Sequence, residues 1–366
     1  MTVTPFHIAV PDQVLDRISR KLADARLGYA PEDADPWAHG MSADYLGDFV
    51  DYWRASYNWR EQEEALNAWP QFKAEIDGIQ IHFYHIRGRG DRPKPILLTH
   101  GWPGSVAEFQ VVMPLLAGEG FSLVVPSLPG FGWSGRPAKP IGPVAVASLW
   151  RRLMTDVLGY EHFFAQGGDF GSAVTVQLAL NHPDVVDAIH LNFFMPPQPG
   201  ADADAALLEY WGKVRQTMEA ESGYHHEQAT KPQTIGLALH DNPVGWAAWV
   251  LEKFHGWGDT GGNIESRFSK DHLITNLMTY LVSDTIISSF WMYYASGREP
   301  RTTGPVTVPT ALARFPAEFY PMPDRALAER QYAVAQWTEM KSGGHFAAME
   351  EPEAFAEDVI AFFKSR

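Results

Sequence analysis

The chain has 366 residues, of which 45% are hydrophobic and 13% aromatic, so it can bury a substantial core within one large domain. Its 29 basic and 44 acidic residues give a formal net charge of -15, and no stretch concentrates lysine or arginine. This balance argues against binding to nucleic acids or anionic membranes. The absence of cysteine excludes disulfides and thiolate metal sites.

The start of the chain, residues 1–11, lacks the charged-then-apolar pattern of a signal peptide. No segment reaches the roughly 20 apolar residues that a membrane helix needs. We therefore expect a cytoplasmic protein without a membrane partner. The sequence does not decide between a monomer and a homodimer.

Residues 1–75 have a helical, aromatic-rich pattern and form the predicted N-terminal segment. Two runs place apolar or aromatic side chains at helical spacings: Val14, Leu15, Ile18 and Leu22 in the first, and Tyr45, Phe49, Tyr52 and Trp53 within residues 42–59 in the second. We expect these side chains to pack the segment onto the rest of the protein.

Strand patterns begin at about residue 76. Residues 79–84 partly alternate between apolar and polar, as a half-buried antiparallel strand would. Residues 95–98 and 121–125 are short apolar runs typical of buried parallel strands, and helical stretches lie between the strands. This alternation predicts the α/β class, with a mostly parallel sheet and helices on both faces.

Residues 199–298 interrupt the strand pattern and are mainly helical, with many Trp, Tyr and His residues. The strand pattern returns in residues 299–366. We therefore predict a core in two parts, 76–198 and 299–366. The helical insertion between them should lie as a cap over the C-terminal edge of the sheet, where α/β proteins bind ligands.

The most informative motif is Gly167-Gly168-Asp169-Phe170-Gly171, which follows an apolar run and precedes a helix-like run. This is the strand–turn–helix context of a nucleophile elbow, with aspartate where serine is usual. A serine that attacks saturated carbon forms an ether, whereas a carboxylate forms an ester that a second step can hydrolyse. Asp169 is therefore predicted as a nucleophile for ring opening or halide displacement, not for acyl transfer.

The general base and its partner are expected later in the chain, in the order acid and then histidine. His345 follows the last predicted strand and precedes the last helix, where the base belongs. Glu318 follows a strand-like run and fits the orienting acid, although Asp324 and Glu299 lie nearby. Such an acid would bond one imidazole nitrogen and leave the other to take a proton from water.

An oxyanion hole is predicted at His100-Gly101-Trp102-Pro103-Gly104, which directly follows a strand. A turn there can aim the Trp102 backbone N–H at the same point as the Phe170 N–H, each donor worth roughly 3 kcal/mol in ester hydrolysis. We expect the His100 imidazole to be structural.

Opening of an epoxide also needs a proton donor for the departing alkoxide, and a phenol is a suitable weak acid in a dry pocket. The predicted cap supplies Tyr224 and the adjacent pair Tyr293-Tyr294. On spacing alone, any one of these tyrosines is more often a core residue.

Five segments together resemble the epoxide hydrolases of the microsomal type: residues 100–105, 167–172, 221–232, 285–293 and 343–352. The resemblance implies an α/β-hydrolase fold with a helical cap, and an N-terminal meander that wraps around cap and core. Carried over by residue, it implies that Asp169 is the nucleophile and that Tyr224 and Tyr293 open the ring. It also implies a Glu318–His345 charge-relay pair and oxyanion amides at Trp102 and Phe170.

The chain departs from the family pattern at two points. Membrane-bound animal members begin with an anchoring helix, which this chain lacks, so it resembles a soluble bacterial-type member. Two adjacent tyrosines stand where one is expected, so Tyr294 competes with Tyr293 for the second ring-opening role.

The sequence thus predicts an epoxide hydrolase that forms a vicinal diol through an ester on Asp169, with water activated by His345. No cofactor is expected, and no metal ion either, because the adjacent His225 and His226 would point in different directions. Epoxide and water are the predicted partners. The substrate class stays open, since the many cap aromatics fit a hydrophobic or aromatic epoxide and a packed cap core equally well.

Two alternatives remain. A haloalkane dehalogenase would share the Asp–His ester chemistry but needs N–H donors for the halide; Trp102 keeps this open, and the tyrosine pair argues against it. A non-catalytic ligand-binding protein of the same fold would usually lack nucleophile, base or acid, and none is missing here.

Overall fold

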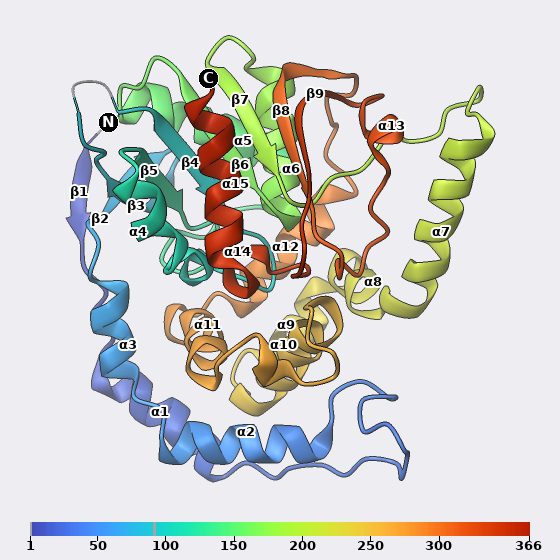
Figure 1. Ribbon diagram of the computed structural model, residues 1–366. Helices are drawn as coiled ribbons and strands as arrows, with labels where there is room; N and C mark the ends of the chain where they lie inside the picture. The colour runs from blue at the N-terminus through green and yellow to red at the C-terminus, as the bar shows by residue number, and fades with distance from the viewer. Residues whose placement is uncertain (1, 91–92) are drawn as a thin grey trace.

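A nine-stranded sheet forms the centre of the computed structural model, which describes residues 2–90 and 93–366 (Figure 1). The strands are β1 (Val3–Phe6), β2 (Gln71–Ile76), β3 (Ile79–Ile86), β4 (Pro95–Thr99), β5 (Ser122–Pro126), β6 (Phe163–Gly167), β7 (Val186–Leu191), β8 (Val306–Arg314) and β9 (Tyr332–Glu339). Their order across the sheet is β1-β2-β3-β5-β4-β6-β7-β8-β9. The pairs from β1 to β5 are antiparallel and all the others parallel, which confirms the predicted mostly parallel sheet.

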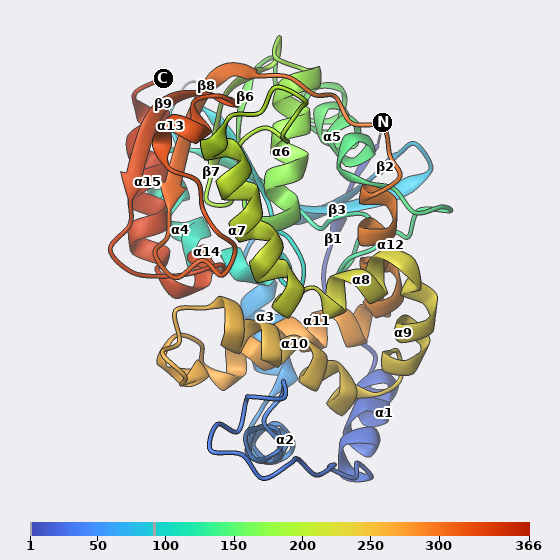
Figure 2. The ribbon, with the colours of Figure 1, turned by 90° about the vertical axis from the view of Figure 1, so that its right-hand side faces the viewer.

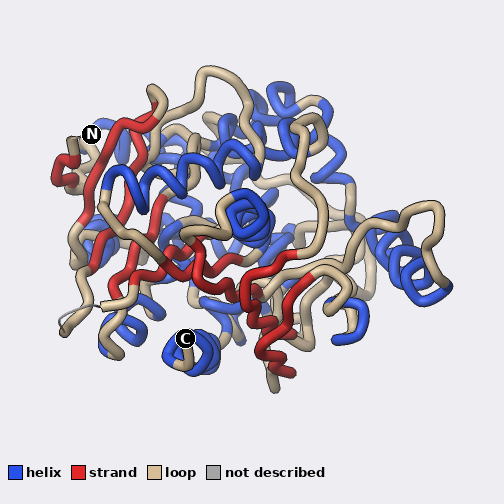
Figure 3. Tube along the Cα trace, turned by 90° about the horizontal axis from the view of Figure 1, so that it is seen from above, coloured by secondary structure: helices blue, strands red, loops and turns tan. Residues whose placement is uncertain are grey.

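Helices cover both faces of the sheet, as Figure 3 shows from above. Helices α5 (Pro143–Arg152) and α6 (Asp169–Asn181) pack side by side on one face, and α4 (Val112–Gly118) and α15 (Pro352–Lys364) on the other. Adjacent β4 side chains enter different cores, because successive side chains of a strand point to opposite faces. The apolar runs of the parallel strands therefore reflect burial on both sides.

Strand β3 corrects one expectation, because it is buried on both faces from Ile81 to Ile86 instead of being half-buried. The rings of Phe6 and Trp133 cover His82, whose imidazole nitrogens lie 2.9 Å from the Ser127 hydroxyl and 2.9 Å from the Gln71 side-chain oxygen. Burial lowers the pKa of His82 to about 3. His82 is thus a neutral core residue, although it occupies a polar position in the sequence pattern.

The N-terminal segment contains the expected helices, α1 (Asp12–Ala23), α2 (Ala43–Ala55) and α3 (Trp59–Leu66). The run over residues 42–59 is not one helix, because α2 ends at Ala55 before α3 begins. Strands β1 and β2 were not predicted in this segment. Strand β1 has only four residues, and its partner β2 lies far along the chain, so no local sequence pattern predicts it.

The cap consists of the helices between β7 and β8: α7 (Ala205–Glu221), α8 (Gly223–Thr230), α9 (Pro232–Leu239), α10 (Pro243–Trp257), α11 (Lys270–Ser283) and α12 (Ile286–Ser296). Two short helices, α13 (Arg325–Ala328) and α14 (Ala347–Glu350), follow in the core. Figures 1 and 2 place α8–α11 below the sheet, between the core and the N-terminal helices α1 and α2. Within the described ranges, no helix combines the length and apolarity needed to cross a membrane.

The N-terminal segment is joined to the cap by specific contacts as well as apolar packing. Helices α1 and α2 touch α10 and α11. The Tyr52 hydroxyl donates to Asp271 at 3.0 Å, and Arg17 forms an ion pair with Asp241 at 2.6 Å. The Trp37 ring stacks on His255 with 3.8 Å between ring centroids. This segment therefore links the sheet edge at β1 and β2 to the far side of the cap.

Glu63 of α3 provides a test of how this segment is anchored. Its buried carboxylate accepts the Val10 backbone N–H at 2.7 Å and the Trp59 indole N–H at 3.1 Å. We expect Glu63→Ala to lower the free energy of unfolding by about 1–3 kcal/mol, because both donors lose their partner in a buried place. Urea unfolding would measure this loss. The exposed neighbour Glu64→Ala is the control, and equal stability of the two variants would refute the assigned role.

Candidate active site

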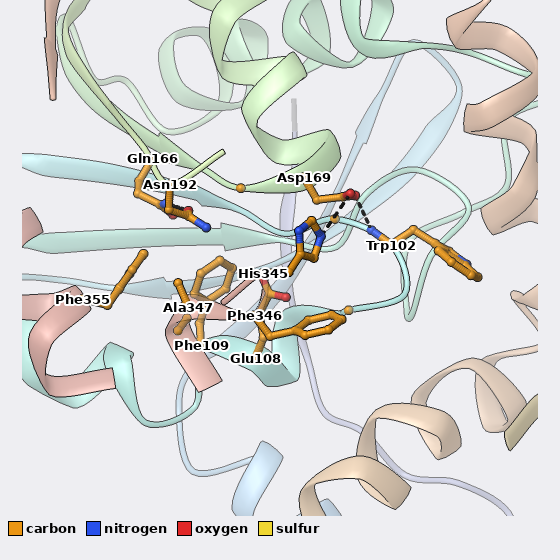
Figure 4. Close-up of a pocket in the computed structure, with 14 residues that line it drawn as sticks. Trp102, Glu108, Phe109, Gln166, Asp169, Asn192, His345, Phe346, Ala347 and Phe355 are labelled. Atoms are coloured by element: carbon orange, nitrogen blue, oxygen red, sulfur yellow. Dashed lines mark hydrogen bonds and ion pairs between the residues drawn. The ribbon is translucent and has the colours of Figure 1, made fainter. Parts of the chain in front are cut away.

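Asp169 lies at a sharp turn between β6 and α6 with a φ of 48°, in the left-handed region. The turn depends on glycine at both ends. A Cβ on Gly171 would lie 1.9 Å from the Thr99 carbonyl oxygen, and one on Gly167 would lie 2.2 Å from the Gly171 carbonyl oxygen. The strand–turn–helix context expected for the elbow is present, and it projects the Asp169 carboxylate beyond the C-terminal edge of the sheet (Figure 4).

His345 lies between two carboxylates. Its Nδ1 is 2.9 Å and 3.0 Å from the two Glu318 side-chain oxygens, and its Nε2 is 3.4 Å from Asp169 Oδ2. The side chains of His345 and Glu318 are both buried. The structure thus brings together the three residues that the sequence proposed as nucleophile, base and acid.

The two alternative acids have other partners. Glu299 accepts the backbone N–H groups of Val144 and Ala145, each at 2.9 Å, at the start of α5. Asp324 caps α13 by accepting the Leu327 N–H at 2.8 Å. Of these three carboxylates, Glu318 is the one in contact with His345.

The protonation of His345 is set by opposing effects. Burial lowers its pKa, but the negative charges of Glu318 and Asp169 and their hydrogen bonds outweigh burial and raise the pKa to about 10. The balance of these effects favours the protonated imidazole between the two carboxyl groups. Because the pKa of His345 is higher in the folded than in the unfolded protein, protonation of His345 increases the free energy of unfolding. This contribution is complete at pH values below the ordinary histidine pKa of about 6.5 and is lost as the pH rises through about 10.

The loop that carries His345 is held by Glu350, which sequence reasoning missed. The buried Glu350 carboxylate accepts three backbone N–H groups, from Asp259 at 2.6 Å, Gly344 at 2.9 Å and Phe346 at 2.8 Å. Burial raises the pKa of Glu350 to about 7, although these hydrogen bonds lower it. The sequence offered no signal for this role, because one donor comes from the distant segment after α10.

The Trp102 backbone N–H donates to Asp169 Oδ1 at 2.8 Å, in the position expected for an oxyanion donor. Helix α11 holds the same loop, with the Asn276 amide donating to the Pro103 carbonyl at 2.7 Å. His100 accepts the Leu128 N–H at 3.1 Å, and burial lowers its pKa to about 4, which fits the structural role expected for it. The second expected donor, the Phe170 amide, stays a prediction.

Tyr224 from α8 and Tyr293 from α12 meet beside this loop. Both are buried, their ring centroids are 5.8 Å apart, and both rings contact the Trp102 indole. Burial, aided by the negative charge of Asp169, raises the pKa of both phenols well above the ordinary value. The buried Lys253, which sequence reasoning did not single out, places its ammonium 4.7 Å from the Tyr224 ring centroid, within the range of a cation–π contact.

Tyr294 faces away from this group. Its ring is only partly buried and stacks under the Arg298 guanidinium, 3.7 Å from the ring centroid. The geometry therefore favours Tyr293 over Tyr294 as the partner of Tyr224.

Among the described residues, no group of three or more His, Cys, Asp or Glu side chains is arranged to hold a metal ion. His225 and His226 are both largely exposed on α8.

An aspartate elbow, a buried His–Glu pair and a helical cap on a mostly parallel sheet define an enzyme of the α/β-hydrolase fold. Two family models match the chain: "Epoxide hydrolase N terminus" over residues 3–109 and "alpha/beta hydrolase fold" over residues 94–227.

Similar proteins narrow this class. The chain is 36% identical to juvenile hormone epoxide hydrolase 2 of Ctenocephalides felis, over 99% of this chain and 86% of that protein. It is 34% identical to epoxide hydrolase 1 of Sus scrofa, over 99% and 88%. The crystal structure of juvenile hormone epoxide hydrolase from Bombyx mori matches with a TM-score of 0.90 at 29% identity, over 100% of this chain and 94% of that one. The chain belongs to the epoxide hydrolase family, whose members are hydrolases acting on ether bonds.

The charge arrangement around His345 can be tested directly. Asp169→Asn removes one of the two negative charges that raise the pKa of His345, so we expect that pKa to fall from about 10 by roughly 1–3 pH units. An NMR titration of ¹⁵N-labelled histidine would follow it. Asp324→Asn, which does not touch His345, should leave the pKa unchanged, and an unshifted pKa in Asp169→Asn would contradict the described coupling.

Proposed function

We propose that the chain converts a hydrophobic epoxide into a vicinal diol through a covalent hydroxyalkyl ester on Asp169. The observation that carries the proposal is the position of His345, between the Glu318 carboxylate and the Asp169 carboxylate. The only reactants required are the epoxide and water.

In the first step, an Asp169 oxygen attacks one epoxide carbon and the bond from that carbon to the ring oxygen breaks. Tyr224 and Tyr293 hydrogen-bond the ring oxygen and supply a proton to the alkoxide. At neutral pH both phenols carry their protons, so both can donate a hydrogen bond to the ring oxygen and one of them can give its proton to the alkoxide.

In the second step, water attacks the ester carbonyl carbon while His345 takes its proton. Formation of the ester removes the charge of Asp169, which is one cause of the raised pKa of His345. The imidazolium proton of His345 passes to the phenolate that the first step leaves, so His345 is neutral and can accept a proton from water while Glu318 keeps the ring in place. The Trp102 amide, and with it the Phe170 amide, stabilises the oxyanion of the tetrahedral intermediate.

The surroundings support an apolar epoxide as substrate. Trp102, Phe170 and Trp257 pack around the tyrosine pair, with ring centroids 4.6 to 5.6 Å from one of its rings. A cavity of about 450 Å³ also borders Asp169, but its wall mixes apolar residues such as Val176 with the charged side chains of Arg301 and Arg330, and the tyrosine pair does not line it.

Trapping of the ester tests the mechanism. His345→Gln should stall the second step, so that an aromatic epoxide, styrene oxide, adds its whole mass to the protein at Asp169. Intact-mass spectrometry with peptide mapping would detect the adduct. The exposed His226→Gln variant should turn over normally and accumulate none. An adduct formed only with a haloalkane would overturn the proposal in favour of dehalogenation.

The two tyrosines can be tested against their neighbour. We expect Tyr224→Phe and Tyr293→Phe each to slow ring opening by about 10²-fold or more, because each loses its acidic hydroxyl. Tyr294→Phe, which changes the adjacent residue in the same way, should stay within about twofold, since it lies outside the site. Rapid-quench measurement of ester formation separates this step from hydrolysis. An equal loss in Tyr294→Phe would disprove the assignment.

A further inference from the structure

A small polar cavity lies beside Asp169 and His345, on the side toward the sheet. It measures about 20 Å³, and its wall includes the polar side chains of Glu108, Gln166 and Asn192 (Figure 4). A cavity needs about 10–15 Å³ of such volume to hold a single water molecule. The cavity therefore has room for about one water, in contact with the residues of the proposed second step.

Two atoms on this wall are suited to bind water. Gln166 is 1% exposed, and its amide nitrogen donates to the Asn192 side-chain oxygen at 2.8 Å. Its carbonyl oxygen has no hydrogen-bond partner among the described residues. His345 also lines the cavity, with its Nε2 3.4 Å from Asp169 Oδ2. An unpaired buried polar atom costs about 1–3 kcal/mol, and an ordered water relieves that cost where the cavity can hold one.

Glu108 forms the opposite part of the wall and is not used in the mechanism above. It belongs to the 3₁₀ turn Val106–Phe109, and its carboxyl lies so close to Gly104 that a Cβ there would come within 2.3 Å of Oε2. Figure 4 shows the Glu108 side chain directed toward the His345 ring. Burial and then the negative charge of Asp169 raise the pKa of Glu108 to about 8. At neutral pH this group is mainly a neutral acid that can both donate and accept a hydrogen bond.

We propose that this cavity holds the water that cleaves the Asp169 ester, and that Glu108 and Gln166 position it between the ester carbon and His345 Nε2. The inference rests on the proposed function, because it presupposes the ester. The water oxygen bonds to Asp169 Cγ, and one water proton passes to His345 Nε2. The bond from Cγ to the diol oxygen then breaks, and that oxygen takes the proton from the imidazolium. The carboxylic acid left on Asp169 gives its remaining proton to His345 Nε2, which restores the carboxylate and the imidazolium. Glu108 ends the cycle in the protonation state in which it began.

Rate measurements on each half-reaction test this role. In Glu108→Leu, which keeps bulk but cannot bind water, we expect ester formation from styrene oxide within about twofold of the wild-type rate. Ester hydrolysis should slow about 10- to 100-fold, the loss expected when a reacting group is misplaced. Intact mass would then find most of the enzyme as ester at steady state. Glu108→Gln, which retains hydrogen-bonding atoms, should recover part of the hydrolysis rate. Glu119→Leu, the same change at an exposed position, is the control.

The outcomes separate this inference from the proposed function. Ester hydrolysis at the wild-type rate in Glu108→Leu would overturn the water site and leave the covalent mechanism standing. Equal slowing of both half-reactions would also overturn it, because a structural defect does not select one step. If Glu108→Leu fails to fold, Gln166→Leu must show the same selective loss. The absence of any ester in His345→Gln would instead refute the proposed function itself.

Discussion

The position of His345 between Glu318 and Asp169 is the constraint on which the rest of the site depends. A buried imidazolium is costly unless it is paired, and here two carboxylates pair it from opposite sides. The surrounding structure fixes this arrangement through the backbone. The His345 N–H donates to the Trp257 carbonyl at 3.0 Å, and Glu350 gathers amides from both the histidine loop and the segment after α10. The end of a cap helix therefore helps to hold His345 in position beside Asp169.

In the proposed mechanism, the same arrangement gives His345 a high affinity for its proton in the first step and a lower affinity in the second. While Asp169 is charged, His345 holds its proton firmly and the carboxylate is oriented by the Trp102 amide. Esterification would neutralise Asp169 and leave Glu318 as the sole adjacent anion. In the proposed mechanism, the first step thus changes the electrostatics for the second.

The sequence was informative where the signal is local. The glycines around Asp169 and the order of Asp169, Glu318 and His345 predicted residues that the structure brings together, because a strand–turn–helix motif is written in adjacent residues. Glu350 and Glu108 escaped prediction, because their surroundings come from distant segments. The sequence could not distinguish Tyr293 from Tyr294, because both fit the same motif. Only the position of helix α12 shows which of the two side chains points toward Tyr224. Burial of β3 on both faces likewise depends on Phe6 and Trp133, which no periodicity in the strand reveals.

The N-terminal segment has a consequence for how molecules enter and leave. At one end its strands belong to the sheet that carries Asp169, and at the other its helices are joined to α10 and α11. A hinged opening of the cap as one rigid lid would have to break the Tyr52–Asp271 and Arg17–Asp241 contacts and peel apolar faces from one another. The segment thus connects the cap to the core. Local displacement of side chains and loops leaves these contacts intact, so the segment favours such rearrangements over a rigid opening of the cap.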